Sequence, residues 1–339
     1  MAKRPTINDV AARAGVHRAT AARALSAAGR GLLAAATVRR VEAAARELGY
    51  TPNRLATALR TDRSMTVGVL LPDLTNPMFP PVVRGLEDAL RRDGYTALLA
   101  STDNDAEREM LHFDTLRGRR VDGFVIATAR RADPVLDRAA ADGVPVVLLN
   151  RSDDSARFSL VTSDDADGLA QAVRHLTGLG HTRIAYLAGP AGVTTADTRV
   201  RAFRRETARA GLDEAATPLL RCPNFSEADG IAGARRVLDK HPEATAIMAG
   251  NDLIALGVLR ALAERGLDCP RDVSVVGYND MRFADAFHPP LTTVRTPHQE
   301  LGAEAAGLLL ALLAEPGATR RVARLPVRLM VRGSTAPPR

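Results

Sequence analysis

Residues 6 to 25 read TINDVAARAGVHRATAARAL, and this stretch decides the fold of the N-terminal part of the chain. Thr6 stands before an apolar helical stripe, and Asp9 follows it at the spacing of a capping box. Gly15 is placed to end this first helix, and a second helical pattern begins almost at once. Two short helices joined by a glycine-containing turn predict a helix-turn-helix motif, whose second helix enters the major groove of DNA.

The early residues of the second helix are therefore candidates for contact with base edges. The expected DNA-binding residues of this module are Thr6, His17, Arg18, Ala19, Thr20 and Arg23. Arg18 and Arg23 suit the O6 and N7 atoms of guanine, where a good bidentate pair gives about 1 to 3 kcal/mol of discrimination. The alternative is that these arginines touch only phosphate, which positions a protein on DNA without reading its sequence.

Positive charge is concentrated at the same end of the chain. Residues 1–63 contain 12 Lys and Arg against 4 Asp and Glu, a net charge of +8, whereas the whole chain of 339 residues carries +7. A small basic head on a nearly neutral body is typical of a nucleic-acid-binding module fused to a domain of another kind.

Beyond residue 62 the pattern changes to short apolar runs that alternate with amphipathic stretches. The expected strands are Val67–Leu71, Ala97–Ala100, Phe124–Ala127, Val144–Leu149, Ile184–Ala188, Ala246–Ala249 and Val273–Tyr278. The expected helices are Pro81–Arg92, Ala166–Leu179, Thr198–Ala210, Ser226–Asp239 and Leu253–Arg265. Strands buried on both faces and alternating with helices predict parallel sheets, here two doubly wound lobes with a cleft between them.

Several motifs in a fixed order resemble the LacI/GalR (lac repressor/galactose repressor) family of transcriptional regulators. The motifs are Thr6 to Leu25, Glu47-Leu48-Gly49-Tyr50-Thr51-Pro52-Asn53, Pro72-Asp73-Leu74-Thr75-Asn76-Pro77 and Val275-Val276-Gly277-Tyr278-Asn279-Asp280. The resemblance runs nearly end to end. It implies an all-α helix-turn-helix domain followed by an α/β body like a periplasmic binding protein, with two doubly wound parallel-sheet lobes.

The resemblance also implies a division of the chain. We expect a helix-turn-helix domain over 1–51, a hinge helix and linker over 52–63, and an effector-binding and dimerisation domain over 64–339. Lobe one is expected at about 64–163 and 291–320, and lobe two at about 164–290 and 321–333. In the hinge, Asn53, Arg54, Ala56 and Leu59 are expected to touch DNA, with Leu59 wedged into the minor groove. The alternative for this segment is a plain interdomain linker.

The chain departs from the family pattern in its DNA-binding head. His17 stands where a serine usually caps the second helix, and Ala21, Ala22 and Ala24 replace Val, Ser and Val. The segment 27–37 is about two residues longer than usual. The operator sequence of other family members therefore cannot be transferred to this chain.

Residues just after the strands of the body are the candidates for binding a small molecule. The family resemblance points to the same places and implies a matching arginine in the pattern that Arg199 opens and an aromatic residue at Phe225. Together they give the expected effector-binding residues Met78, Phe79, Asn150, Arg199, Phe225, Asn251 and Asn279. Phe79 and Phe225 offer aromatic faces, with a purely structural core position as the alternative for each. The three amides both donate and accept hydrogen bonds, which favours a polyhydroxylated or heterocyclic ligand over a strongly charged one.

No pattern in the chain indicates catalysis, a metal site or a cofactor. The loop after Ala188 lacks the Gly-Lys-Ser/Thr end of a P-loop, the histidines are scattered, and Asp164 and Asp165 are expected to cap a helix. With no apolar run long enough to span a bilayer, we expect a cytoplasmic protein. The expected partners are a palindromic double-stranded operator, a small-molecule effector and a second copy of the chain in a homodimer. The alternatives are a cytosolic sugar-binding module without a DNA role and an α/β enzyme.

Overall fold

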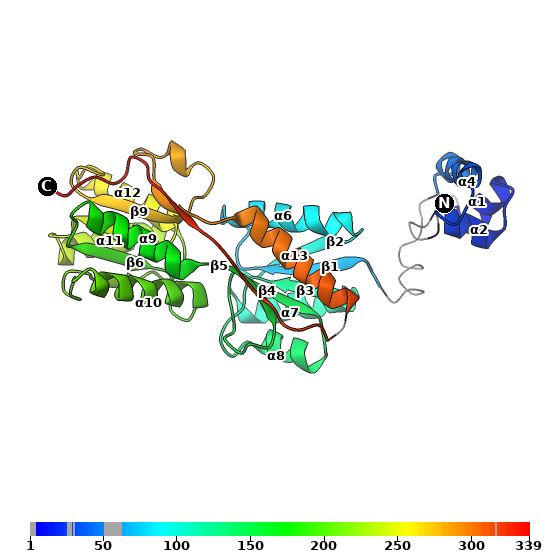
Figure 1. Ribbon diagram of the computed structural model, residues 1–339, viewed down its shortest axis with the longest axis horizontal. Helices are drawn as coiled ribbons and strands as arrows, with labels where there is room; N and C mark the ends of the chain where they lie inside the picture. The colour runs from blue at the N-terminus through cyan, green and yellow to red at the C-terminus, as the bar shows by residue number, and fades with distance from the viewer. Residues whose placement is uncertain (1–4, 26–28, 30, 51–62, 316) are drawn as a thin grey trace. The chain divides into compact units, whose positions relative to one another are not determined.

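The computed structural model describes residues 5–25, 29, 31–50, 63–315 and 317–339. The chain divides into two compact units, Met1–Ser64 and Met65–Arg339, here called the head and the body (Figure 1). Each unit has its own hydrophobic core.

The described part of the head contains α1 (Ile7–Arg13), α2 (Arg18–Ala24) and α4 (Ala35–Glu47). Thr6 and Asp9 form the expected capping box: the Asp9 amide donates to Thr6 Oγ1 at 3.4 Å, and the Thr6 amide donates to Asp9 Oδ2 at 2.7 Å. His17 caps α2, with its Nδ1 accepting from the Ala19 amide at 3.3 Å. In contrast, the N-cap residue of α4 is Ala34, which offers no side-chain cap, in the segment where the sequence departs from the family pattern.

The core of the head is built from small side chains. Its fully packed members are Val10, Ala11, Ala14, Ala21, Ala24, Val38, Val41, Ala44 and Ala45. Because alanines bury little apolar area, burial contributes less here than in a core of larger residues. An exposed ion pair between Arg13 and Glu47 also joins α1 to α4, with 3.0 Å between Arg13 Nε and Glu47 Oε2.

Lobe one of the body is a parallel sheet of six strands in the order β11-β5-β4-β3-β1-β2. The strands are β1 (Thr66–Leu71), β2 (Thr96–Ser101), β3 (Gly123–Ile126), β4 (Val146–Leu149), β5 (Ser159–Ser163) and β11 (Val322–Leu325). Its helices are α6 (Phe79–Arg92), α7 (Ala106–Gly118), α8 (Pro134–Ala141) and α13 (His298–Ala314). One apolar core lies under α6 and α13 and another under α7 and α8, so both faces of the sheet are covered.

Lobe two repeats this plan with a sheet in the order β12-β10-β9-β8-β6-β7, in which only the β10–β12 pair is antiparallel. The strands are β6 (Ile184–Ala188), β7 (Leu219–Arg221), β8 (Ala246–Ala249), β9 (Ser274–Asn279), β10 (Thr292–Arg295) and β12 (Arg328–Met330). The helices are α9 (Asp165–Gly178), α10 (Thr194–Arg209), α11 (Glu227–Lys240) and α12 (Asp252–Glu264), with a short 3-10 turn, η1 (Ala284–Ala286). Cores under α11 and α12 and under α9 and α10 complete the lobe.

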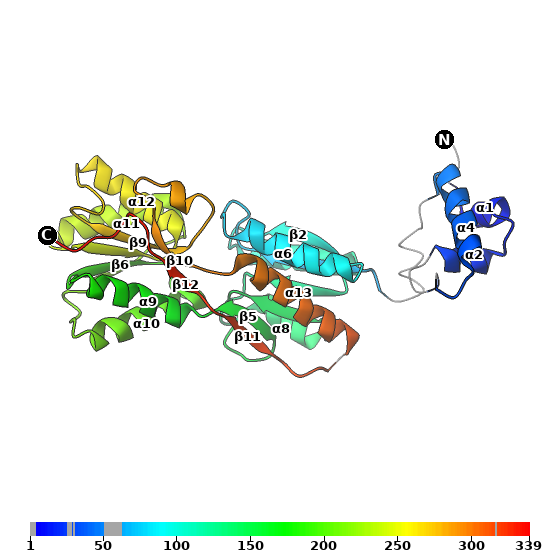
Figure 2. The ribbon, with the colours of Figure 1, turned by 45° about the horizontal axis from the view of Figure 1, so that its top comes forward.

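The chain passes between the lobes after β5, after β10 and between β11 and β12 (Figure 2). These crossings correct the expected lobe boundaries. Residues 292–295 were expected in lobe one, but β10 pairs with β9 in lobe two; residues 322–325 were expected in lobe two, but β11 pairs with β5 in lobe one. Which strands pair in a sheet depends on contacts between residues far apart in the chain, so the local sequence pattern does not determine it.

The strands and helices expected from the sequence in the body are all present, with ends that differ by up to four residues, whereas the expected hinge helix lies outside the described residues. The largest difference is α10, which begins at Thr194 instead of Thr198 and so brings its first turn to the cleft. Elements that the sequence analysis did not single out include the helices α7, α8 and α13 and the strands β5, β7, β10, β11 and β12.

Candidate functional site

The expected DNA-binding residues of the head lie on its surface. Thr6, His17, Arg18, Ala19 and Arg23 are exposed, and Thr20 is half-buried. Ala21 and Ala24 of the same helix are fully buried against the core, which directs Arg18 and Arg23 outward. The helix-turn-helix is thus formed with its second helix accessible to a groove. Asn53, Arg54, Ala56 and Leu59 lie outside the described residues, so their expected contacts stay predictions.

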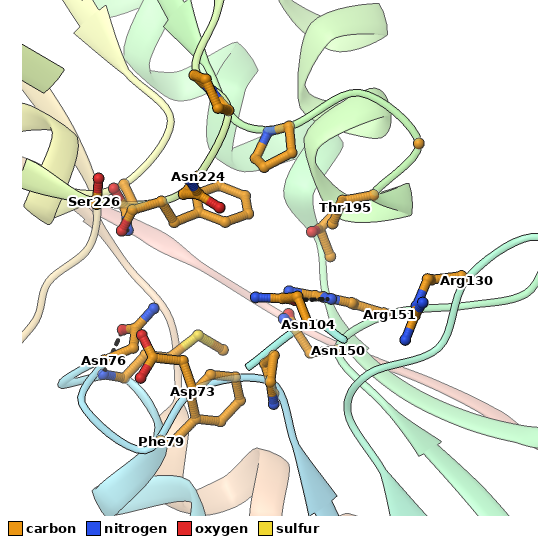
Figure 3. Close-up of a pocket in the computed structure, with 18 of the residues that line it drawn as sticks. Asp73, Asn76, Phe79, Asn104, Arg130, Asn150, Arg151, Thr195, Asn224 and Ser226 are labelled. Carbon is orange, nitrogen blue, oxygen red and sulfur yellow. Dashed lines mark hydrogen bonds between the residues drawn. The ribbon is translucent and has the colours of Figure 1, made fainter. Parts of the chain in front are cut away.

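A cavity of about 750 Å³ lies between the two lobes of the body (Figure 3). All seven expected effector-binding residues line it: Met78, Phe79, Asn150, Arg199, Phe225, Asn251 and Asn279. Most of them follow the carboxyl ends of strands, which meet at one edge of a parallel sheet. The volume falls within the usual range for small-molecule sites.

Asn150 and Asn279 each offer the cavity an unused acceptor. Both residues are buried, and among the described residues their Oδ1 atoms have no hydrogen-bond partner. Both also have a left-handed backbone, with φ of 66° and 109°, which asparagine tolerates better than most residues. Because buried polar atoms normally have partners, these oxygens are suited to accept hydrogen bonds from ligand hydroxyl or amino groups.

Arg199 is held in a buried network at the side of the cavity. Its Nε and Nη2 donate to Asp165 Oδ1 at 3.1 and 3.0 Å, and its Nη1 donates to the Gly250 carbonyl at 2.8 Å. Its guanidinium carbon lies 3.6 Å from the centroid of the Tyr278 ring, and the Tyr278 hydroxyl donates to Asp165 Oδ1 at 2.8 Å. Burial, with the negative charge of Asp165, raises the pKa of Tyr278 well above its usual value and keeps this donor protonated. Arg199 is therefore held in a fixed position, and Nε, Nη1 and Nη2 of its guanidinium each already donate a hydrogen bond within the protein.

The remaining expected residues have mixed roles. Phe79 is buried in the core of lobe one as well as lining the cavity, and Phe225 is half-buried against the core of lobe two. A Cβ on Gly189 would lie 2.2 Å from the Phe225 ring, so the glycine makes room for that ring. Asn251 caps α12, with Oδ1 accepting from the Ile254 amide at 2.9 Å and Nδ2 donating to the Phe225 carbonyl at 3.3 Å. Its amide positions the Phe225 loop.

Several cavity residues were missed by the sequence analysis. They include Asp73, Asn76, Asn104, Arg130, Arg131, Arg151, Thr195, Asn224 and Ser226. The rule that ligands bind after the strand ends would have found Arg151, which directly follows Asn150, and Arg130, which follows β3. Asp165 was expected only to cap a helix. In the structure Asp164 caps α9, and Asp165 lies buried against Arg199.

Two contacts join the lobes at the edge of the cavity. Arg131 of lobe one lies 2.8 Å from Asp197 of lobe two, measured from Nη1 to Oδ2, and the Ser152 amide donates to Thr194 Oγ1 at 2.9 Å. Burial opposes the charge of Asp197, but hydrogen bonds from Arg131 and Arg221 hold its pKa below the usual value. These contacts require the lobes to be close, so opening of the cleft breaks them.

The described residues contain no group of three or more His, Cys, Asp or Glu side chains placed to hold a metal ion. Among the helices in that part of the chain, none is long and apolar enough to cross a membrane.

Comparison with known proteins defines the class. The family model described as "Bacterial regulatory proteins, lacI family" matches residues 6–53, and the model described as "Periplasmic binding protein-like domain" matches residues 173–335. A helix-turn-helix head on a two-lobed binding-protein body is a DNA-binding transcriptional regulator with its ligand-binding domain in the same chain.

Curated relatives match over nearly the whole length. The HTH-type transcriptional regulator CelR of Thermobifida fusca is 35% identical, over 98% of both chains. The ribose operon repressor of Escherichia coli (strain K12) is 33% identical, over 97% of this chain and 99% of the repressor. This chain belongs to the LacI family.

Solved structures agree in fold. The lac repressor dimer bound to operator and the anti-inducer ONPF has a TM-score of 0.86 at 30% identity, covering 98% of this chain and 100% of that chain. The complex of the transcriptional regulator CelR with cellobiose has a TM-score of 0.74 at 33% identity, with the same coverage. The fold expected from the sequence is confirmed.

Proposed function

We propose that this regulator is a homodimeric repressor whose operator affinity is controlled by a small molecule bound between the lobes of the body. The observation that carries the proposal is the cavity itself: residues from separate segments of both lobes line about 750 Å³, and two buried amide oxygens there lack a protein partner. The same chain presents an exposed helix with two arginines from a helix-turn-helix head.

The relatives support a sugar-like effector. Four of them are ribose operon repressors, one similar structure contains cellobiose and another contains bound ribose. The unpartnered Oδ1 atoms of Asn150 and Asn279 suit the hydroxyls of such a ligand. A ligand that binds one arrangement of the lobes more tightly would shift the arrangement of the DNA-binding heads, with a coupling of typically about 1 to 3 kcal/mol.

A homodimer is supported by the lac repressor neighbour, which is a dimer on its operator. Two symmetric heads would read a roughly palindromic site. We place the protein in the cytoplasm, where bacterial operator DNA lies, and we assign it no reaction because the family is one of transcriptional regulators.

The proposal is tested with the full-length protein and the DNA upstream of its own gene. Fluorescence anisotropy is expected to show binding to one duplex that exceeds binding to random competitor by about a thousand-fold or more at physiological salt. The same measurement with candidate sugars is expected to change that affinity. If no duplex is preferred over random competitor, with or without sugars, the cytosolic sugar-binding alternative takes its place.

A further inference from the structure

Arginine side chains gather at one end of the cavity, where strands of lobe one end. Arg130 follows β3, Arg151 follows β4, and Asn104 follows β2, the edge strand of the same sheet. Figure 3 shows Asp73 beside Asn76 and Phe79, on the other side of the cavity from Arg130. The two ends of the cavity therefore differ in charge.

Arg151 differs from the other arginines of the cavity wall in its partners. Three of them are paired: Arg130 with Glu109, Arg131 with Asp154 and Asp197, and Arg199 with Asp165. Arg151 donates from Nη1 to the Asn104 Oδ1 atom at 2.9 Å, and in the described part of the chain no carboxylate forms an ion pair with it. Only 6% of the residue is exposed. Arg151 is thus a buried guanidinium held by a neutral amide.

The carboxylates of this region are engaged with other partners. Asp103, which lines the cavity next to Asn104, pairs with Arg108. Glu109 is buried, pairs with Arg130 and accepts a hydrogen bond from Thr128. Asp133 accepts from the Arg130 amide at 3.2 Å and caps α8 through the Val135 amide at 3.0 Å. Burial raises the pKa of Glu109 and of Asp133.

A guanidinium stays charged even when it is buried. Burial, with a smaller effect of the positive charge on Arg130 and against the opposing negative charge of Glu109, lowers the pKa of Arg151 to about 10, which still leaves it protonated at neutral pH. A buried charge without a counter-ion is unfavourable, and Asn104 satisfies only one of the five donors of the guanidinium. The positive charge of Arg151 therefore destabilises the ligand-free protein. Binding sites often contain such unfavourable groups, because function is kept at a cost in stability.

We propose that the effector carries an anionic group, a carboxylate or a phosphate, on a polyhydroxylated body. The anion lies against Arg151, with Arg130 beside it, and hydroxyls donate to the Oδ1 atoms of Asn150 and Asn279. This inference rests on the proposed function, since it names the class of effector for the same cavity. It also revises the expectation of a weakly charged ligand, which considered the asparagines without Arg151.

The test compares matched ligands on full-length protein by calorimetry. The panel is glucose, glucuronate and glucose 6-phosphate, with ribose, ribonate and ribose 5-phosphate as a second set. At least one acidic member is expected to bind about ten-fold or more tightly than its neutral counterpart, because hydrogen bonds to charged groups are the stronger kind. Comparison of the sugar acids with the sugar phosphates shows whether the cavity prefers a carboxylate or a phosphate.

Arg151→Gln is expected to remove this preference, while Arg138→Gln, an exposed arginine of α8 that does not line the cavity, is expected to leave it unchanged. Neutral sugars that bind as tightly as their acids, in protein that still responds to them, would overturn the anionic effector and leave the proposed function intact. A loss of all preference between operator and random DNA would count against the proposed function instead.

If no member of the panel binds, the thermal stability of the ligand-free protein tests whether Arg151 lacks a counter-ion. Arg151→Met removes the charge and keeps most of the side-chain volume, so an unpaired Arg151 predicts a melting temperature raised by about 2 to 4 °C. A lowered melting temperature would show that Arg151 is a structural residue satisfied by Asn104, and would overturn the inference.

Discussion

The head and the body hold the arginines that we propose for recognition in opposite ways. In the head, Arg18 and Arg23 stand exposed on a helix whose core is six alanines and three valines. In the body, Arg151 and Arg199 are buried beneath a cleft in lobes whose cores contain Tyr186, Tyr278 and several phenylalanines. Burial of a charged side chain is unfavourable, and a small core contributes too little free energy to offset this cost, whereas a large core can. We therefore propose that DNA phosphate is contacted at the surface of the head and the effector inside the cavity of the body.

Separation of the two regions is expected to have the largest effect. Deletion of residues 1–62 leaves the body, which is a compact unit of its own from Met65. Operator binding should be abolished, while effector affinity measured by calorimetry stays within about two-fold, because no cavity residue is removed. Loss of both activities would show that the regions are not independent.

Arg199→Ala tests the buried network of the body. It leaves Asp165 without its cation, which is expected to cost about 3 to 5 kcal/mol of unfolding free energy and to abolish the effector response. Arg201→Ala on the exposed side of the same helix is the control, with a change below about 0.5 kcal/mol. The double variant with Asp165→Asn should recover part of the loss in thermal unfolding; strict additivity would contradict the coupling.

Leu59→Ala tests the expected link to the minor groove. If the leucine is a wedge, specific binding should weaken by about 1 to 3 kcal/mol, the size of one lost specific contact. Non-specific binding, which depends on phosphate contacts, should change little. Salt titrations of both kinds of binding measure the difference, and equal losses would favour a plain linker.

Thr6→Ala compares the stability of the regions directly. Loss of this cap is expected to cost the head about 1 kcal/mol, and Asp105→Ala, which removes the cap of α7, should cost the body a similar amount. Because the head has the smaller core, the same cost should remove a larger share of its stability. Calorimetry without DNA would show this as a larger shift for the head, and equal shifts would argue against the comparison.

Asp197→Asn is expected to have the smallest effect. Asp197 is mostly buried and also pairs with Arg221, but its partner across the cleft, Arg131, is exposed, so loss of the pair between the lobes should change effector affinity by less than about 1 kcal/mol. Asp154→Asn is the matched control, because Asp154 pairs with the same arginine within lobe one. An equal effect of both variants would exclude a role for the pair in closing the cleft.

The lowered pKa of Asp197 predicts how the contact between the lobes depends on pH. The pKa of Asp197 is lowered in the folded protein, so its contribution is fully present above the usual pKa of about 4 and is lost as the pH falls through the lowered value. Between pH 5 and 8, roughly, this group should leave effector affinity unchanged.

The sequence by itself determined the local features of this protein. The capping box at Thr6, the turn at Gly15, the strand runs and the asparagines of the cavity could all be predicted, because caps, turns and strand ends depend on neighbours in the chain. Arg199 and Phe225 were predicted from the family resemblance. Family resemblance supplied the order of the parts.

Only the tertiary structure decided which distant groups are paired. That Asp165 neutralises Arg199 across 34 residues, that Arg131 meets Asp197 from the other lobe, and that Arg151 has an amide where a carboxylate is expected are results of packing between separate elements. Strands β10 and β11 exchanged lobes relative to expectation for the same reason. Such pairings depend on distances in space, which the local pattern of residues does not contain.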